Sequence, residues 1–130
     1  MKRGVPHTIR AEQALLGAVL SDPAGQAQLL DLVTAEDMTR PYHAQVLQAM
    51  QRLHGRGVAP TPAAVYQEIQ NDPDMPRHLS HDGIQLADLM EASPRSAHAP
   101  AYAAMVIDTG LRRRIELSAS RMKQAARTGN

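Results

Sequence analysis

The sequence predicts an all-α protein: a compact orthogonal bundle of about six helices that continues into one long C-terminal helix. Alanine, leucine, glutamine and methionine dominate the periodic segments, and no segment alternates polar and apolar residues with a period of two. Prolines and glycines lie where one periodic segment gives way to the next, as expected at helix ends. We expect residues 1–99 to form a globular head with a flexible N-terminal segment, residues 1–8, and residues 100–130 to form the long helix.

The segment AEQALLGAVLSDP, residues 11–23, predicts a helix that ends at Ser21. Asp22 precedes Pro23, and a residue before proline is disfavoured in the α conformation. The longest apolar run, Ala14–Leu20, is far too short to cross a bilayer. We therefore expect the central core helix of the head, with four other helices leaning on its broad apolar face of Leu15, Leu16, Val19 and Leu20.

A second helix is expected over about residues 23–33, with Ala27, Leu30 and Val33 facing inward. The next four residues, TAED, predict one short helical turn. Thr34 can cap the amides that follow it, and Asp37 can reach back to Thr34, as in a capping box.

The segment RPYHAQVLQAMQRLHGRG, residues 40–57, predicts the clearest helix of the chain. Pro41 suits the first helical position, and Gly55 or Gly57 suits the end. The inward positions recur at helical spacing and are Tyr42, Val46, Ala49, Met50 and Leu53. The opposite face is polar and holds Gln45, Gln48 and Arg52.

Two shorter helices follow. Thr61 and Pro62 open the first, in which Val65 and Ile69 face inward. After an exposed polar loop, a helix over about residues 83–92 aligns Ile84, Ala87 and Met90.

From Pro100 no residue stops the last helix before the final TGN. Its first half is apolar on two sides, one with Tyr102, Met105 and Val106 and the other with Ala104, Ile107 and Leu111. Its second half keeps only a narrow stripe at coiled-coil-like spacing, formed by Leu111, Ile115, Ser118, Met122 and Ala125. A wide face suits burial in a core, whereas a narrow stripe suits one partner helix. The candidate partner or oligomer interface therefore consists of Leu111, Arg112, Arg113, Arg114, Ile115 and Met122.

The basic residues gather in the same region. Residues 112–130 hold six basic residues and one acidic residue, a formal charge of +5, whereas eight basic and twelve acidic residues give residues 1–111 a charge of −4. The run Arg112–Arg114 is either a solvated helix face, or it pairs with acidic groups of a partner protein or with phosphates. Three tyrosines are the only aromatic residues of the FWY class, which disfavours a platform that stacks bases.

No catalytic or cofactor site is visible. The sequence contains neither the phosphate-binding pattern G-x-x-x-x-G-K-[ST] nor G-x-G-x-x-G, so we expect no cofactor and no enzymatic activity from this chain. His78 and His81 with Asp82 come closest to a metal site, but we interpret them as a solvated loop. His43 and His54 are interpreted as packed or capping groups. Cysteine is absent and the N-terminus lacks the apolar stretch of a signal peptide, which favours a cytoplasmic location.

Three segments in order together resemble one family, the N-terminal domain of the DnaB-type replicative DNA helicases. They are AEQALLGAVLSDP, EDMTRPYHAQVLQAMQRLHGRG and DGIQLADLMEASPRSAHAPAYAAMVIDTGLRRRI. The resemblance covers about residues 9–116. The chain departs from the family pattern at Met38, Thr39, His98 and Gly110.

The resemblance implies a non-catalytic collar: a helical bundle followed by a helical hairpin, of which the helix from Pro100 is the first arm. It implies self-association as a dimer or higher oligomer and docking of primase or a loader during DNA replication, with DNA contacted only weakly or indirectly. ATP and Mg²⁺ would belong to a separate motor domain, and no membrane is involved. The alternative that the residues leave open is a free-standing helical regulator, which binds DNA or an acidic partner through the basic C-terminal helix.

Overall fold

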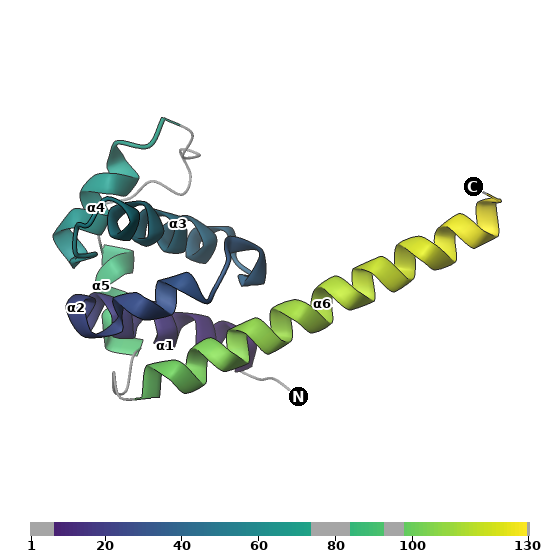
Figure 1. Ribbon diagram of the computed structural model, residues 1–130, viewed down its shortest axis with the longest axis horizontal. Coiled ribbons are helices and arrows are strands. Elements are labelled where there is room, and N and C mark those ends of the chain that lie inside the picture. Colours follow the sequence, from purple (N-terminus) through teal and green to yellow (C-terminus); the bar gives the residue numbers. More distant parts are fainter. Residues whose placement is uncertain (1–6, 74–83, 93–97, 130) are drawn as a thin grey trace.

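The computed structural model describes residues 7–73, 84–92 and 98–129. These residues form six α-helices and two short 3₁₀ helices, and none of them lies in a strand. The first five α-helices make up the head, and α6 (Ala99–Thr128) crosses the head and continues far beyond it (Figure 1). The all-α class and the long C-terminal helix are therefore confirmed.

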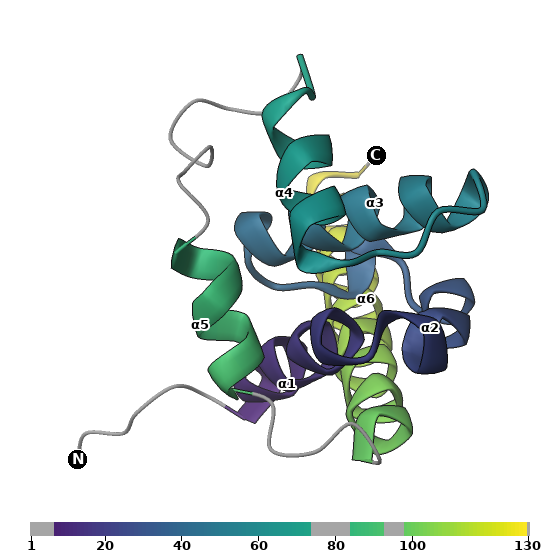
Figure 2. The same ribbon diagram turned by 90° about the vertical axis from the view of Figure 1, so that its left-hand side faces the viewer.

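Helix α1 (His7–Ser21) lies at the centre of the head. It contacts α2, α3, α5 and α6, and Leu16, Ala18 and Val19 have no exposed surface (Figure 2). The expected central core helix with four helices around it is thus present. It begins at His7 and not near Ala11, so residues 7 and 8 belong to the helix, and residues 1–6 lie outside the described residues.

The single helix expected over residues 23–33 is replaced by two short elements, α2 (Pro23–Gln26) and the 3₁₀ helix η1 (Ala27–Asp31). Asp22 caps α2, because its Oδ1 accepts a hydrogen bond of 3.2 Å from the Gly25 amide. Gln26 leaves the α conformation at φ −108° and ψ 3°, which ends α2 after one turn. The tighter turns that follow still bury Leu30, and Val33 just after them is buried as well.

The next elements match the prediction closely. A second 3₁₀ helix, η2 (Ala35–Asp37), forms the expected short turn, and Oδ2 of Asp37 accepts from the Thr34 amide at 3.0 Å. Helix α3 (Pro41–Gly55) follows, and Gly57 takes a left-handed φ of 77° after it. Helix α4 (Pro62–Gln70) packs against α3 and is capped by Thr61, whose hydroxyl accepts from Ala64 at 3.2 Å.

Helix α5 (Ile84–Ala92) is present, and its inward face matches the expected one only in part, since Met90 is partly buried against the core. Leu86 and Leu89 are buried against the core and Ala87 is exposed. Residues three apart share one side of a helix, so burial of this leucine pair on α1 turns Ala87 outward.

The inward face of α6 is also narrower than predicted. It is a stripe of mostly small residues, Ala99, Ala103, Val106 and Gly110, which lets α6 approach α1 and η2 closely. Met105 and Leu111, expected on core-facing sides, are exposed. Helix α6 ends at Gly129, which has a left-handed φ of 78°, as the final TGN predicts.

Candidate protein–protein interface

The apolar members of the candidate interface are all exposed. The exposed fractions of Leu111, Ile115 and Met122 are 48%, 58% and 67%. They lie four and seven positions apart on one helix, so they form a single stripe, which we call the seam. Ser118 and Ala125 continue the seam between and beyond them.

The part of α6 that carries most of the seam has left the head. From residue 115 to residue 129 every side chain is exposed except that of Ala125, which is intermediate. We call residues 115–129 the arm. Figure 1 shows the arm, in yellow-green to yellow, extending away from the other helices. Among the described residues, the head therefore leaves the seam open to another molecule.

The three arginines of the candidate interface have different neighbours. Nε of Arg112 pairs with Oδ2 of Asp108 at 2.9 Å on the same helix. Arg113 donates to the backbone carbonyl of Glu36 at 2.8 Å, and Arg114 pairs with Oδ1 of Asp37 at 2.7 Å. Two of the three arginines thus contact η2 of the same chain. The sequence analysis did not predict these contacts within the domain.

A buried charged group was also missed. Glu12 and His43 are almost fully buried, and Nδ1 of His43 lies 2.7 Å from Oε1 of Glu12. Oε2 of Glu12 accepts from the amide and the hydroxyl of Thr39, both at 2.8 Å. The available signal was a glutamate inside an otherwise apolar helix segment, beside Ala11 and Ala14. His43 is indeed a packed residue, as expected.

The environment of Glu12 favours its charged form. Burial alone would raise the pKa of this carboxyl, but the hydrogen bonds from His43 and Thr39 outweigh it and hold the pKa below its usual value. The carboxylate joins α1, α3 and the segment after η2. We interpret this cluster as a structural anchor, because its polar atoms bind one another and Glu12 has almost no exposed surface.

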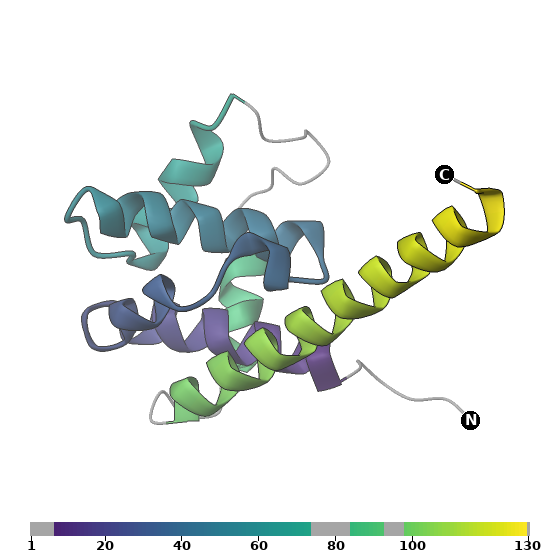
Figure 3. The same cartoon turned by 45° about the vertical axis from the view of Figure 1, so that its right-hand side comes forward.

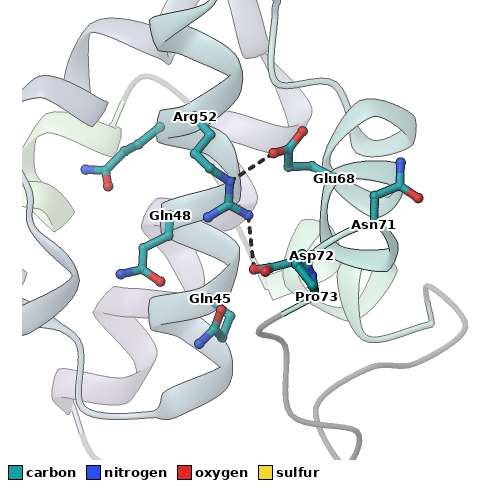
Figure 4. Close-up of a pocket in the computed structure, with 8 residues that line it drawn as sticks. Gln45, Gln48, Arg52, Glu68, Asn71, Asp72 and Pro73 are labelled. Carbon is teal, nitrogen blue, oxygen red and sulfur yellow. Dashed lines mark hydrogen bonds and ion pairs between the residues drawn. The ribbon is translucent and has the colours of Figure 1, made fainter.

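A polar pocket of about 680 Å³ lies between α3 and α4 (Figure 4). Arg52 bridges Glu68 at 2.9 Å and Asp72 at 3.4 Å across it, and Arg56 pairs with Glu68 at 2.8 Å. The hydrogen bonds from Arg56 and Arg52 lower the pKa of Glu68 to about 2. Gln45 and Gln48 line the same pocket, as their predicted polar face requires. The arrangement resembles a surface ion-pair network more than a reaction centre.

The described residues contain no group of three or more histidine or acidic side chains placed to hold a metal ion. His78, His81 and Asp82, the residues weighed for that role, lie outside the described residues. None of the described helices is long and apolar enough to cross a membrane.

Sequence comparison identifies the family. The family model described as DnaB-like helicase N terminal domain matches residues 4–108. The chain belongs to this family. The candidate interface, which begins at Leu111, follows the last matched residue.

Relatives in the family are replicative helicases many times longer than this domain. The chain is 31% identical over 120 residues to the replicative DNA helicase DnaB of Geobacillus stearothermophilus. This alignment covers 92% of the chain and 26% of that protein. It is 29% identical over 127 residues to the DnaB of Mycobacterium leprae. That alignment covers 98% of the chain and 21% of the relative. The chain therefore spans about a quarter of these relatives or less, and corresponds to their N-terminal domain.

Solved structures of the same domain share the fold. The N-terminal domain of DnaB helicase from Mycobacterium tuberculosis superposes with a TM-score of 0.83 at 29% identity, over 92% of this chain and 84% of that one. The Helicobacter pylori domain gives a TM-score of 0.74 at 14% identity, over 95% and 99% of the two chains. The predicted family and fold are confirmed together.

Proposed function

We propose that this domain holds helicase subunits together through α6, docks a primase or a helicase loader, and performs no catalysis itself. The observation that carries the proposal is the seam, an apolar stripe on an arm that its own head leaves uncovered. ATP and Mg²⁺ would bind to a motor domain elsewhere in the helicase, and no cofactor would bind to this domain.

The apolar area of the seam is large enough for two copies of α6 to associate weakly. Full burial of one such side chain is worth about 1.5–3 kcal/mol, so three half-exposed side chains on each of two arms would contribute about 5–9 kcal/mol. Association costs about 4–15 kcal/mol in lost freedom of motion and ordering. We therefore expect self-association that depends on protein concentration.

Sedimentation velocity over a range of concentrations tests the pairing. Ile115→Glu and Met122→Glu place a charge in the seam and are expected to shift the domain to monomer. Gln124→Glu is the matched control, because it adds the same charge to the same exposed helix on another face. Circular dichroism should show equal helix content in all three variants. A wild-type domain that stays monomeric throughout, or a control that dissociates as readily as the seam variants, would contradict the proposal.

Primase docking is supported by the family and by one of its structures. The Helicobacter pylori domain is described with its interactions with primase, and it has this fold. Titration calorimetry with purified bacterial primase tests docking directly. The expected result is binding by the wild-type domain; absence of binding to both primase and a purified loader would remove this part of the proposal.

A second candidate function, DNA binding, rests on the charge of the arm. Arg121, Lys123 and Arg127 are exposed there. Arg113 and Arg114 instead contact Glu36 and Asp37 of η2. A test should therefore replace the first three with alanine, since replacing Arg113 or Arg114 also removes contacts within the domain. Each phosphate contact contributes about −0.9 to the slope of log K against log salt. Absence of binding to a short fluorescent duplex at low salt would exclude this candidate.

A further inference from the structure

The middle of α6 is bound to η2 as well as packed on α1. Arg113 donates to the carbonyls of Glu36 and Met38 at 2.8 and 3.4 Å, and Nη1 of Arg114 pairs with Oδ1 of Asp37 at 2.7 Å. Both arginines are half-buried, and almost all of the side chains that follow them on α6 are exposed. Figure 3 shows α6 continuing beyond the head. We call Gly110, Arg113 and Arg114, together with residues 36–38, the clasp.

Gly110 lets the two elements come into contact. A Cβ atom added at this position would lie 2.5 Å from Oδ1 and 2.8 Å from Cα of Asp37. The second of these atoms is backbone, so a larger residue would force α6 and η2 apart. Gly110 departs from the family pattern noted above, and the close approach gives a physical reason for a glycine at this position in this chain.

The η2 side of the clasp is itself anchored. Oδ2 of Asp37 accepts from the amide and the hydroxyl of Thr34, which ties the carboxylate to its own turn. Thr39, two residues later, binds the buried Glu12 of α1, and Glu12 binds His43 of α3. The clasp is thereby connected through short contacts to two core helices.

We propose that the clasp fixes the direction in which the arm leaves the head, so that Gly110, Arg113 and Arg114 act as positioning residues for the seam. Helix α6 packs on α1 through mostly small side chains, and Tyr102 and Ile107 are partly buried against the core. The second contact, on η2, defines a direction. Closed assemblies need each subunit to present its interface at a set angle. The use of a fixed arm in self-association rests on the proposed function, whereas the fixed direction does not.

The complete absence of cysteine makes the direction measurable. Cysteines replace Gln67 on α4 and Ser120 on the arm, both exposed, and carry spin labels. Pulsed electron paramagnetic resonance then gives the distribution of distances between head and arm. Labelled protein is diluted into an excess of unlabelled protein, so that only distances within one copy are recorded.

The expected result is a narrow distribution for the wild-type arm. Arg113→Ala with Arg114→Ala should broaden and shift it, and so should Gly110→Ala. Arg114→Lys keeps a cation near Asp37 and should restore a distribution narrower than that of Arg114→Ala. Arg112→Ala is the control, because it removes the same charge from α6 at a residue that pairs with Asp108 on its own helix.

Three readings would overturn the inference: a broad wild-type distribution, unchanged distributions in the clasp variants, or an equal change in the control. Circular dichroism and thermal unfolding accompany each sample. If Gly110→Ala unfolds the head, the double arginine variant, which adds no atoms, still decides the matter. Sedimentation of the seam variants tests the proposed function separately, so failure of either experiment leaves the other intact.

Discussion

Nδ1 of His43 on α3 lies 2.7 Å from Oε1 of Glu12 on α1, and both side chains are almost fully buried. A carboxylate can only accept, so this ring nitrogen carries the proton. The same carboxylate holds Thr39 through two further hydrogen bonds. One glutamate thus connects two core helices with the segment that leads from η2 into α3.

Glu12→Ala is expected to destabilise the domain strongly. It removes one partner of a buried pair and leaves His43 and Thr39 without their acceptor, a loss of about 3–5 kcal/mol. Urea denaturation followed by circular dichroism measures this change. Glu116→Ala, on the exposed arm, is the control and should stay within about 0.5 kcal/mol of the wild type. An effect of Glu12→Ala as small as that of the control would show that the cluster contributes little.

Acid should weaken the domain through the same residue. The pKa of Glu12 is lowered in the folded state from its usual value of 4.5, so the folded domain binds this proton less readily than the unfolded chain does. This contribution to stability is complete above pH 4.5 and is lost as the pH falls through the folded pKa. Glu12→Gln, which cannot ionise, should flatten the pH dependence of the unfolding free energy below pH 4.5. If the unfolding free energies of the wild type and Glu12→Gln changed with pH in parallel, Glu12 would not cause the acid sensitivity.

Glu68 should titrate at unusually low pH. Hydrogen bonds from Arg56 and Arg52 lower the pKa of its carboxyl to about 2. A carbon-detected NMR titration of the side-chain carboxyl should therefore have its midpoint near that value. In Arg52→Ala with Arg56→Ala, the midpoint should rise toward 4.5, the usual pKa of a glutamate side chain. A wild-type midpoint already near 4.5 would mean that the ion pairs do not persist in solution.

Leu16→Ala should cost about 2–5 kcal/mol, because Leu16 is fully buried in the centre of α1 and its loss leaves a cavity. Leu32→Ala makes the same chemical change at a side chain that is 61% exposed, and should cost less than about 0.5 kcal/mol. Thermal and urea unfolding of the two variants give the comparison directly. Similar losses at both positions would contradict the difference in burial between Leu16 and Leu32.

The sequence predicted helices where local signals agree. Pro41, Gly57, Thr61 and Pro62 mark the ends of α3 and the start of α4. The apolar periodicity of α3 predicted four of its buried residues correctly but missed Leu47, which is fully buried. These features depend on residues within a few positions of one another. Helix ends and most buried positions of this kind can therefore be predicted from the sequence alone.

The errors arose where a distant element decides the outcome. Nothing near Ala87 shows that α1 will receive Leu86 and Leu89 instead. Similarly, Arg113 and Arg114 read as a free basic run until η2, more than seventy residues earlier, is placed beside them. The exposed seam was foreseen as a periodic stripe, but its role stays a prediction that sedimentation must test.

Among the described residues, nearly every side chain of the arm is exposed, although Leu117 and Arg121 line a small pocket with Glu36 of η2. Helices of about 12–15 residues are only marginally stable on their own in water. In a lone copy the turns near Gly129 should therefore open and close rapidly, and their amide hydrogens should exchange fast. Docking against a second helix would slow that exchange, so the end of the arm would report association before any change in the core.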